Sequence, residues 1–115
     1  MELLSEIRAD ALHVTVGEAR IDSAVAIRFK ERMREVAIGG PSRVVLDLGQ
    51  VTFLDSSGLG AVVAVMKLLA PGQRLELCCL TPTVAKVFRL TRMDRVFTIH
   101  DDAGAAFAVA SDCRE

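Results

Sequence analysis

Tryptophan and tyrosine are absent from this 115-residue sequence, and phenylalanine contributes five residues. Charge of one sign is also lacking, because 14 Lys and Arg residues balance 15 Asp and Glu residues and leave a formal net charge of −1. Proteins that bind nucleic acids usually combine a basic surface with aromatic side chains that stack on bases. The sequence therefore predicts no direct binding to nucleic acid.

Typical metal ligands are scarce as well. The cysteines Cys78, Cys79 and Cys113 form no CxxC pair, and His13 and His100 do not complete a recognised metal-ligand spacing. We therefore expect neither a metal nor another cofactor. The simplest interpretation is that the thiols are small core or surface residues in a reducing compartment.

Long apolar runs are missing too. Although 51% of the residues are hydrophobic, no uncharged run approaches the roughly 18 residues of a membrane span, and Lys67 interrupts the richest stretch. Glu2 and Glu6 stand where a signal peptide would carry basic residues. We expect a soluble, cytoplasmic protein with no membrane insertion, folded as one domain over residues 1–115.

The apolar residues that are present follow two periods. Residues 3–8, a turn at Ala9 and Asp10, and the alternation of residues 12–16 predict an antiparallel hairpin in which His13 faces solvent. From Asp22 the apolar residues recur every three or four positions, which predicts an amphipathic helix ended by the Gly39-Gly40-Pro41 segment.

Strands and helices then alternate over short links. The sequence predicts strands at 44–48, 75–80 and 96–100, with His100 facing the following loop, and helices at 57–70, 83–92 and 102–111. This order indicates an α/β domain with a mostly parallel sheet, an N-terminal antiparallel hairpin and about four helices. The helix at 57–70 is apolar nearly all round, so we expect it to be buried except for its first turn and Lys67.

Polar residues gather directly before this apolar helix, in the segment Asp55-Ser56-Ser57-Gly58-Leu59-Gly60. A purely structural explanation is available, because Asp and Ser are preferred N-cap residues that satisfy free backbone N–H groups. The same position also suits a phosphate, since backbone donors and the positive end of the helix dipole both favour an anion. Phosphorylation there would add negative charge beside Asp55 and repel a bound partner while leaving the fold intact.

This segment, preceded by the strand Arg43-Val44-Val45-Leu46-Asp47-Leu48, resembles the signature of STAS domains, specifically the bacterial anti-sigma factor antagonists. The resemblance extends over nearly the whole chain, through Arg20-Ile21-Asp22-Ser23, Val87-Phe88-Arg89-Leu90 and Met93-Asp94-Arg95-Val96-Phe97. It implies a non-enzymatic protein whose unphosphorylated form binds an anti-sigma factor that is also a serine kinase, and so releases a sigma factor. Phosphorylation of the motif serine would end this interaction, and a serine phosphatase would restore it.

Carried over by position, the resemblance makes Ser56 the phosphorylated residue and assigns partner binding to a small set of residues. That set is Asp22, Asp55, Ser56, Ser57, Gly58 and Gly60. Two positions depart from the family pattern, since Ala19 and Arg92 stand where glycine is usual. Arg92 would cap a helix in a left-handed conformation that favours glycine, so we expect a different local backbone or strain there.

Alternative functions remain to be weighed. A serine hydrolase would need the G-x-S-x-G pattern, in which glycine stands two residues before the serine, but Leu54 occupies that position before Ser56. A dinucleotide-binding loop would need a third glycine where the chain has Val63. A STAS subunit of a membrane transporter, such as a phospholipid-type ABC system, or of a sensory assembly remains open, because it would dock a partner through the same loops without phosphorylation.

Overall fold

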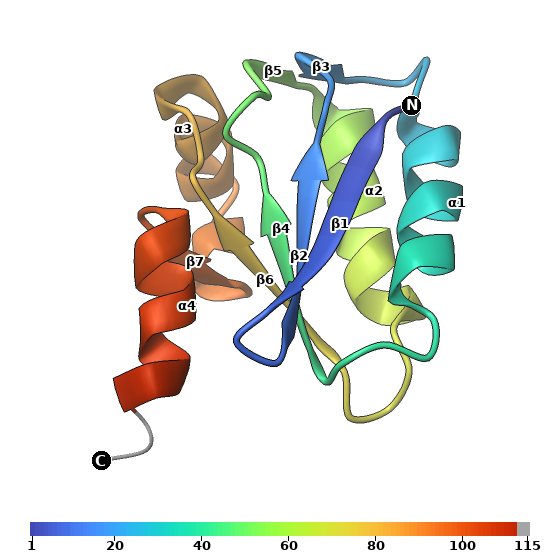
Figure 1. Ribbon diagram of the computed structural model, residues 1–115. Helices are drawn as coiled ribbons and strands as arrows, with labels where there is room; N and C mark the ends of the chain where they lie inside the picture. The colour runs from blue at the N-terminus through green and yellow to red at the C-terminus, as the bar shows by residue number, and fades with distance from the viewer. Residues whose placement is uncertain (113–115) are drawn as a thin grey trace.

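A five-stranded sheet with the order β1-β2-β4-β6-β7 forms the centre of the protein. The computed structural model describes the backbone of residues 1–112 and the side chains of residues 1–107 (Figure 1). The strands are β1 (Leu3–Arg8), β2 (Ala11–Val16), β4 (Arg43–Asp47), β6 (Arg74–Cys78) and β7 (Thr98–His100). β1 and β2 are antiparallel and the other pairs are parallel, which confirms the predicted α/β architecture.

The hairpin turn between β1 and β2 consists of the two residues that the sequence predicts. Ala9 and Asp10 both adopt positive φ, at 49° and 64°. Two consecutive residues with positive φ are typical of a type I′ turn, whose twist matches that of the two strands. The turn fixes the register, so Leu3 lies opposite Val16.

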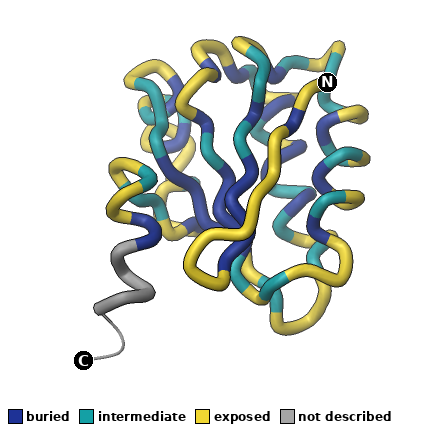
Figure 2. The backbone as a smooth tube through the Cα atoms, viewed as in Figure 1, coloured by how far each residue is buried: buried dark blue, intermediate teal, exposed yellow. Residues whose placement is uncertain are grey.

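Helices cover both faces of the sheet. The bounds are α1 (Ala26–Ala37), α2 (Ser56–Leu68), α3 (Pro82–Leu90) and α4 (Ala103–Asp112), with a short 3₁₀ helix, η1 (Met93–Arg95), after α3. Helices α1, α2 and α3 enclose the main core, in which Phe29, Leu46 and Phe88 are fully buried. Helix α4 packs on the opposite face, where Phe107 contacts a smaller apolar cluster (Figures 1 and 2).

Helix α2 is less buried than its composition predicts. Its buried positions, Gly58, Ala61, Val62 and Val65, form one stripe at helical spacing. The last turn is open, and Leu68 is 50% exposed. The expectation that only the first turn and Lys67 reach solvent is wrong, because α2 lies beside α1 in a single layer and turns one side outward.

Both histidines differ from their predicted orientations. His13, predicted to face solvent, is 7% exposed and its Nε2 lies 2.9 Å from Asp47 Oδ2. His100, predicted to face a loop, has an 11% exposed side chain whose Nε2 lies 2.8 Å from Glu76 Oε1. Both corrections have one cause: helix α4 covers the sheet face that carries these residues, as the contact between the His13 and Phe107 rings shows.

A charged network anchors α4 to this face. Arg43 donates two hydrogen bonds to Glu76 Oε1, at 3.0 and 2.8 Å, and a third to the backbone carbonyl of Ala106 in α4. Arg74 donates to Glu76 Oε2 at 2.9 Å. Burial alone would raise the pKa of the Glu76 carboxyl, but hydrogen bonds from Arg43, His100 and Arg74 together outweigh burial and lower it to about 2. Glu76 is therefore a buried carboxylate stabilised by its partners.

Arg92 takes the left-handed conformation that the family pattern assigns to glycine. Its φ and ψ are 63° and 18°, and it lies between Thr91, the C-cap residue of α3, and η1. Because a residue with a Cβ atom is disfavoured in this region, the predicted local strain is present.

Candidate functional site

The serine turn lies at the carboxyl edge of the sheet, where a second, two-stranded parallel sheet is formed. After β4 the chain runs through residues 48–52 into β5 (Phe53–Leu54), which pairs with β3 (Arg20–Ile21). The backbone N–H groups of Thr52 and Phe53 donate to the Ala19 carbonyl at 2.8 and 3.1 Å. This pairing brings the Asp22 and Ser56 segments side by side, at the top of Figure 1.

Asp55 caps helix α2 and leaves both serines exposed. Its backbone is extended, and its Oδ1 accepts a hydrogen bond from the Gly58 N–H at 2.8 Å. The capping role predicted for one residue of this turn thus belongs to Asp55. Ser56 and Ser57 are the first two residues of the helix, and within the described residues no hydrogen bond engages either hydroxyl. Both hydroxyls therefore stand free at the positive end of the helix dipole.

Gly58 is required by packing. It is buried, and a Cβ built on it would lie 2.0 Å from the Ile21 carbonyl oxygen and 2.8 Å from Leu54 Cδ1. No side chain fits in this space, so glycine lets the first turn of α2 rest directly on β3. We infer that any influence of Gly58 on a partner is indirect, through the position of the serines.

Gly60, two residues later, has the opposite environment. It is exposed, its φ is not in the left-handed region, and no atom lies within 4 Å of a Cβ built there. Nothing in the described fold requires glycine at this position. The absence of a side chain leaves open space next to the serines.

Asp22 stabilises the start of the neighbouring segment. Its Oδ1 accepts a hydrogen bond from the Ala24 N–H at 3.1 Å, and its Oδ2 accepts one from Arg20 Nε at 3.3 Å. The Arg20 guanidinium also stacks on Phe53, with Cζ 4.1 Å from the ring centroid. Phe53 is 37% exposed. Together these residues add a cation and an aromatic ring to the surface beside the serine turn.

Sequence reasoning missed Arg20 and Phe53 as surface residues of this site. Their strands are two residues long, which is too short for hydrophobic alternation to reveal them. The available signal is Phe53 itself, a large apolar residue directly before a run of small polar ones. The site surface, defined here as Arg20, Asp22, Phe53, Ser56, Ser57 and Gly60, combines charge, an aromatic ring and free hydroxyls.

Comparison with known proteins gives the family. The STAS domain profile matches residues 4–106. The chain belongs to the STAS domain family. It is 32% identical over 107 residues to BtrV of Bordetella bronchiseptica, which carries the provisional name of an anti-sigma factor antagonist; the match covers 90% of this chain and 92% of BtrV.

Solved structures share the STAS fold across different functions. An anti-sigma factor antagonist from Mycobacterium paratuberculosis superposes with a TM-score of 0.84 at 24% identity, covering 96% of this chain and 94% of that one. A sulfate transporter family protein from Wolinella succinogenes superposes with a TM-score of 0.76 at 16% identity, covering 92% and 88%. At these identities the likeness establishes the fold alone. Within the described part of the chain, no helix combines the length and apolar character needed to cross a bilayer.

Proposed function

We propose that this STAS protein is an anti-sigma factor antagonist that binds an anti-sigma factor with serine kinase activity, and that phosphorylation of Ser56 ends the binding. The observation that carries the proposal is the free Ser56 hydroxyl, exposed at the first position of α2 beside the capping carboxylate of Asp55. The relation to BtrV favours the same family function.

The geometry favours a switch that acts at the surface. A phosphate on Ser56 would add roughly 1.5 to 2 negative charges at neutral pH. The N-terminal backbone of α2 would stabilise that charge, so the fold should tolerate it. A partner fitted to a neutral hydroxyl would meet like-charge repulsion or a buried anion without a counter-ion. A serine phosphatase that removes the group would restore binding, and the cycle would take place in the cytoplasm.

This role requires no catalysis by the protein itself. A nucleophilic serine needs a general base within hydrogen-bond reach. His13 and His100 belong to the sheet face under α4 and bond to Asp47 and Glu76, so neither is directed to the serine turn. We therefore assign the site surface to protein binding.

The kinase reaction tests the proposal. The purified protein is incubated with ATP and the anti-sigma factor encoded nearest to its gene, and intact mass and peptide mapping follow. We expect one added phosphate, on Ser56, which Ser56→Ala abolishes and Ser57→Ala retains. Phosphate on Ser57, or no transfer from a kinase shown to be active on another substrate, would contradict the assignment.

The transporter alternative remains compatible with the fold, because a sulfate transporter family protein from Wolinella succinogenes has the same fold. In that case the site surface would dock on a transporter subunit with Ser56 unmodified. Co-purification with a transporter ATPase, together with an absence of phosphate on protein isolated from its own cells, would favour that function.

A further inference from the structure

A second cluster of reactive side chains lies on the sheet face under α4, away from the layer of α1 and α2. It consists of His13 in β2, Asp47 at the end of β4 and Cys78 at the end of β6, and one ligand atom from each lies within 4.8 Å of the other two. The strand register explains the cluster, because Asp47 pairs directly with Cys78, and His13 stands two residues before Thr15, the partner of Asp47. Three separate strands thus place an imidazole, a carboxylate and a thiol together.

Cys79 adds a fourth donor. Its Sγ lies 3.4 Å from Cys78 Sγ. Consecutive residues of a strand normally point to opposite faces, but Cys79 has a φ of 65°, the left-handed conformation that a residue with a side chain rarely adopts. This backbone brings the two sulfur atoms together. Cys78 is buried while Cys79 is half-buried, so the pair has a route to solvent through Cys79.

We propose that His13, Asp47, Cys78 and Cys79 bind one zinc ion. Imidazole and thiolate ligands favour zinc over magnesium or calcium, and with the Asp47 carboxylate the three residues of these types make four donors, which match the tetrahedral preference of zinc. Zinc bonds of about 2.0 to 2.3 Å place ligand atoms roughly 3.3 to 3.8 Å apart. The ligand atoms of His13, Asp47 and Cys78 all lie within 4.8 Å of one another, and His13 Nε2 is 2.9 Å from Asp47 Oδ2. Cys79 Sγ lies 3.4 Å from Cys78 Sγ, so side-chain rotation can bring it into the same coordination sphere.

Binding exchanges protons for the metal. Burial raises the pKa of the Cys78 thiol and that of the Cys79 thiol, so both are protonated in the free protein. Coordination by zinc would release these two protons to solvent and replace the hydrogen bond between His13 Nε2 and Asp47. The ring proton would then reside on His13 Nδ1, which has no hydrogen-bond partner among the described residues. We expect weaker binding than in zinc sites whose histidines donate to an outer carboxylate.

The sequence gives no sign of this group, because spacing rules detect ligands that are close along the chain. Here the ligands come from three strands, and only the parallel register unites them. The inference is independent of the serine turn and of the proposed switch.

The test uses the full-length, fully reduced protein. Titration with Co²⁺ should produce the thiolate-to-metal charge-transfer band and the intense visible bands of a tetrahedral site, saturating at one ion per chain. Zinc affinity is then measured by competition with a chromogenic chelator. His13→Gln and Cys78→Ser should each weaken zinc binding by about tenfold or more. His100→Gln is the matched control and should bind like wild type, since His100 lies on the same face but bonds to Glu76.

Cys113 lies outside the described residues, so the titrations are repeated on Cys113→Ser, which should give the same bands. Circular dichroism confirms the fold of each variant, and if Cys78→Ser does not fold, Cys79→Ser and Asp47→Asn replace it. The proposal fails if the folded, reduced wild type shows no thiolate–cobalt band. It also fails if the ligand variants keep wild-type affinity, or if His100→Gln loses as much affinity as His13→Gln.

Discussion

Two glycines in the first turns of α2 allow packing to be separated from helix propensity. Replacing either glycine with alanine should raise the free energy of unfolding by the same intrinsic amount, about 1 kcal/mol in a helix interior, because alanine has the higher helix propensity. At Gly60 the added methyl enters open space, so this gain is the whole effect. At Gly58 the methyl would lie 2.0 Å from a backbone carbonyl oxygen of Ile21, which no side-chain rotation can relieve.

The two substitutions should therefore have opposite signs. To reach an ordinary contact distance, α2 in Gly58→Ala must move away from β3 by more than about 1 Å, and overpacking of this kind costs about 1 to 3 kcal/mol or more. We expect Gly58→Ala to lower the free energy of unfolding by about 2 kcal/mol and Gly60→Ala to raise it by about 0.5 to 1 kcal/mol.

Urea denaturation followed by circular dichroism measures both values, with the slope checked to confirm a two-state transition. For a domain of this size, each kcal/mol should shift the melting temperature by roughly 4 °C. Wild-type stability of Gly58→Ala would refute the argument that α2 rests directly on Ile21. A second readout follows from the same geometry: Gly60→Ala should remain folded yet bind the partner less tightly, because its methyl raises the surface beside the serines.

Three further predictions concern the rest of the molecule. The Glu76 pKa of about 2 lies below the ordinary 4.5, so the stabilisation that it reflects is complete above about pH 4.5 and is lost as the pH falls toward 2. Glu76→Gln should be less stable than wild type at pH 7, and its urea midpoint should fall less steeply as the pH is lowered. A urea midpoint that falls as steeply as in wild type would contradict the network. Arg92→Gly should raise the free energy of unfolding by about 0.5 to 1 kcal/mol, since it removes a non-glycine residue from the left-handed conformation. A lower free energy of unfolding would show that a contact of the Arg92 side chain stabilises the fold by more than this strain costs. Phe53→Ala should weaken partner binding by about tenfold with little loss of stability, as expected for an exposed aromatic residue beside the docking surface; unchanged affinity measured by calorimetry would place the interface elsewhere.

Local sequence patterns predicted the elements of the fold well. Period-two alternation gave the hairpin with its turn at Ala9 and Asp10, and helical spacing gave α1, because each pattern reports directly on which side of an element is buried. The ends of the later strands and helices shifted by one or two residues, as for α2, which starts at Ser56 rather than Ser57. Capping by Asp55 explains this start.

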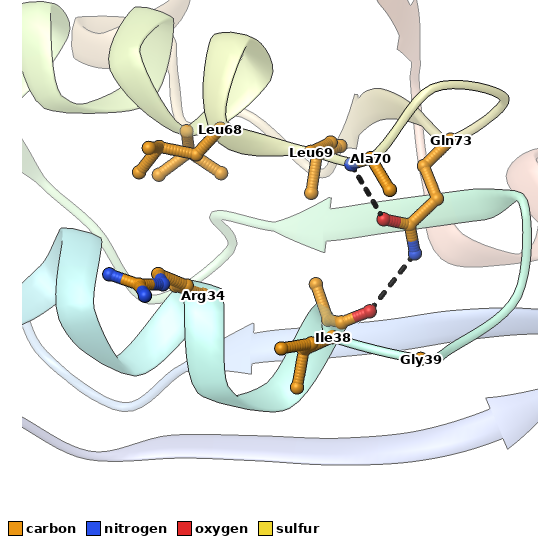
Figure 3. A pocket seen from close by; sticks show the side chains of 9 residues that line it. Arg34, Ile38, Gly39, Leu68, Leu69, Ala70 and Gln73 are labelled. Carbon is orange, nitrogen blue, oxygen red and sulfur yellow. Dashed lines mark hydrogen bonds between the residues drawn. The ribbon is translucent and has the colours of Figure 1, made fainter.

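Features that depend on distant elements could not be predicted in this way. His13 looks solvent-facing because its strand alternates, yet α4, formed some ninety residues later, covers it. The cleft in Figure 3 lies between the ends of two helices that meet only in the folded chain. Arg34 and Ile38 from the α1 side face Leu68 and Leu69 from the α2 side. Gln73 closes the cleft and donates a hydrogen bond to the Ala37 carbonyl. The cluster of His13, Asp47 and Cys78 likewise depends on register alone.

The serine turn lies between these two cases. Its residues are adjacent in the sequence and its N-capping depends on them alone, so the sequence could predict an exposed Ser56 and a capping carboxylate. The pairing of β3 with β5, which adds Arg20 and Phe53 to the same surface, is tertiary and was not visible. The partner-binding role of Asp22, Ser57 and Gly60 stays a prediction that rests on this surface.

The most direct test of the central claim compares the partner affinity of unmodified protein with that of protein phosphorylated on Ser56, with melting temperatures measured on the same two samples. We predict that phosphorylation lowers affinity for the kinase anti-sigma factor by tenfold or more, while the melting temperature stays the same or rises. Equal affinities, or a loss of binding that follows a large fall in melting temperature, would contradict an electrostatic switch at the surface of an intact fold.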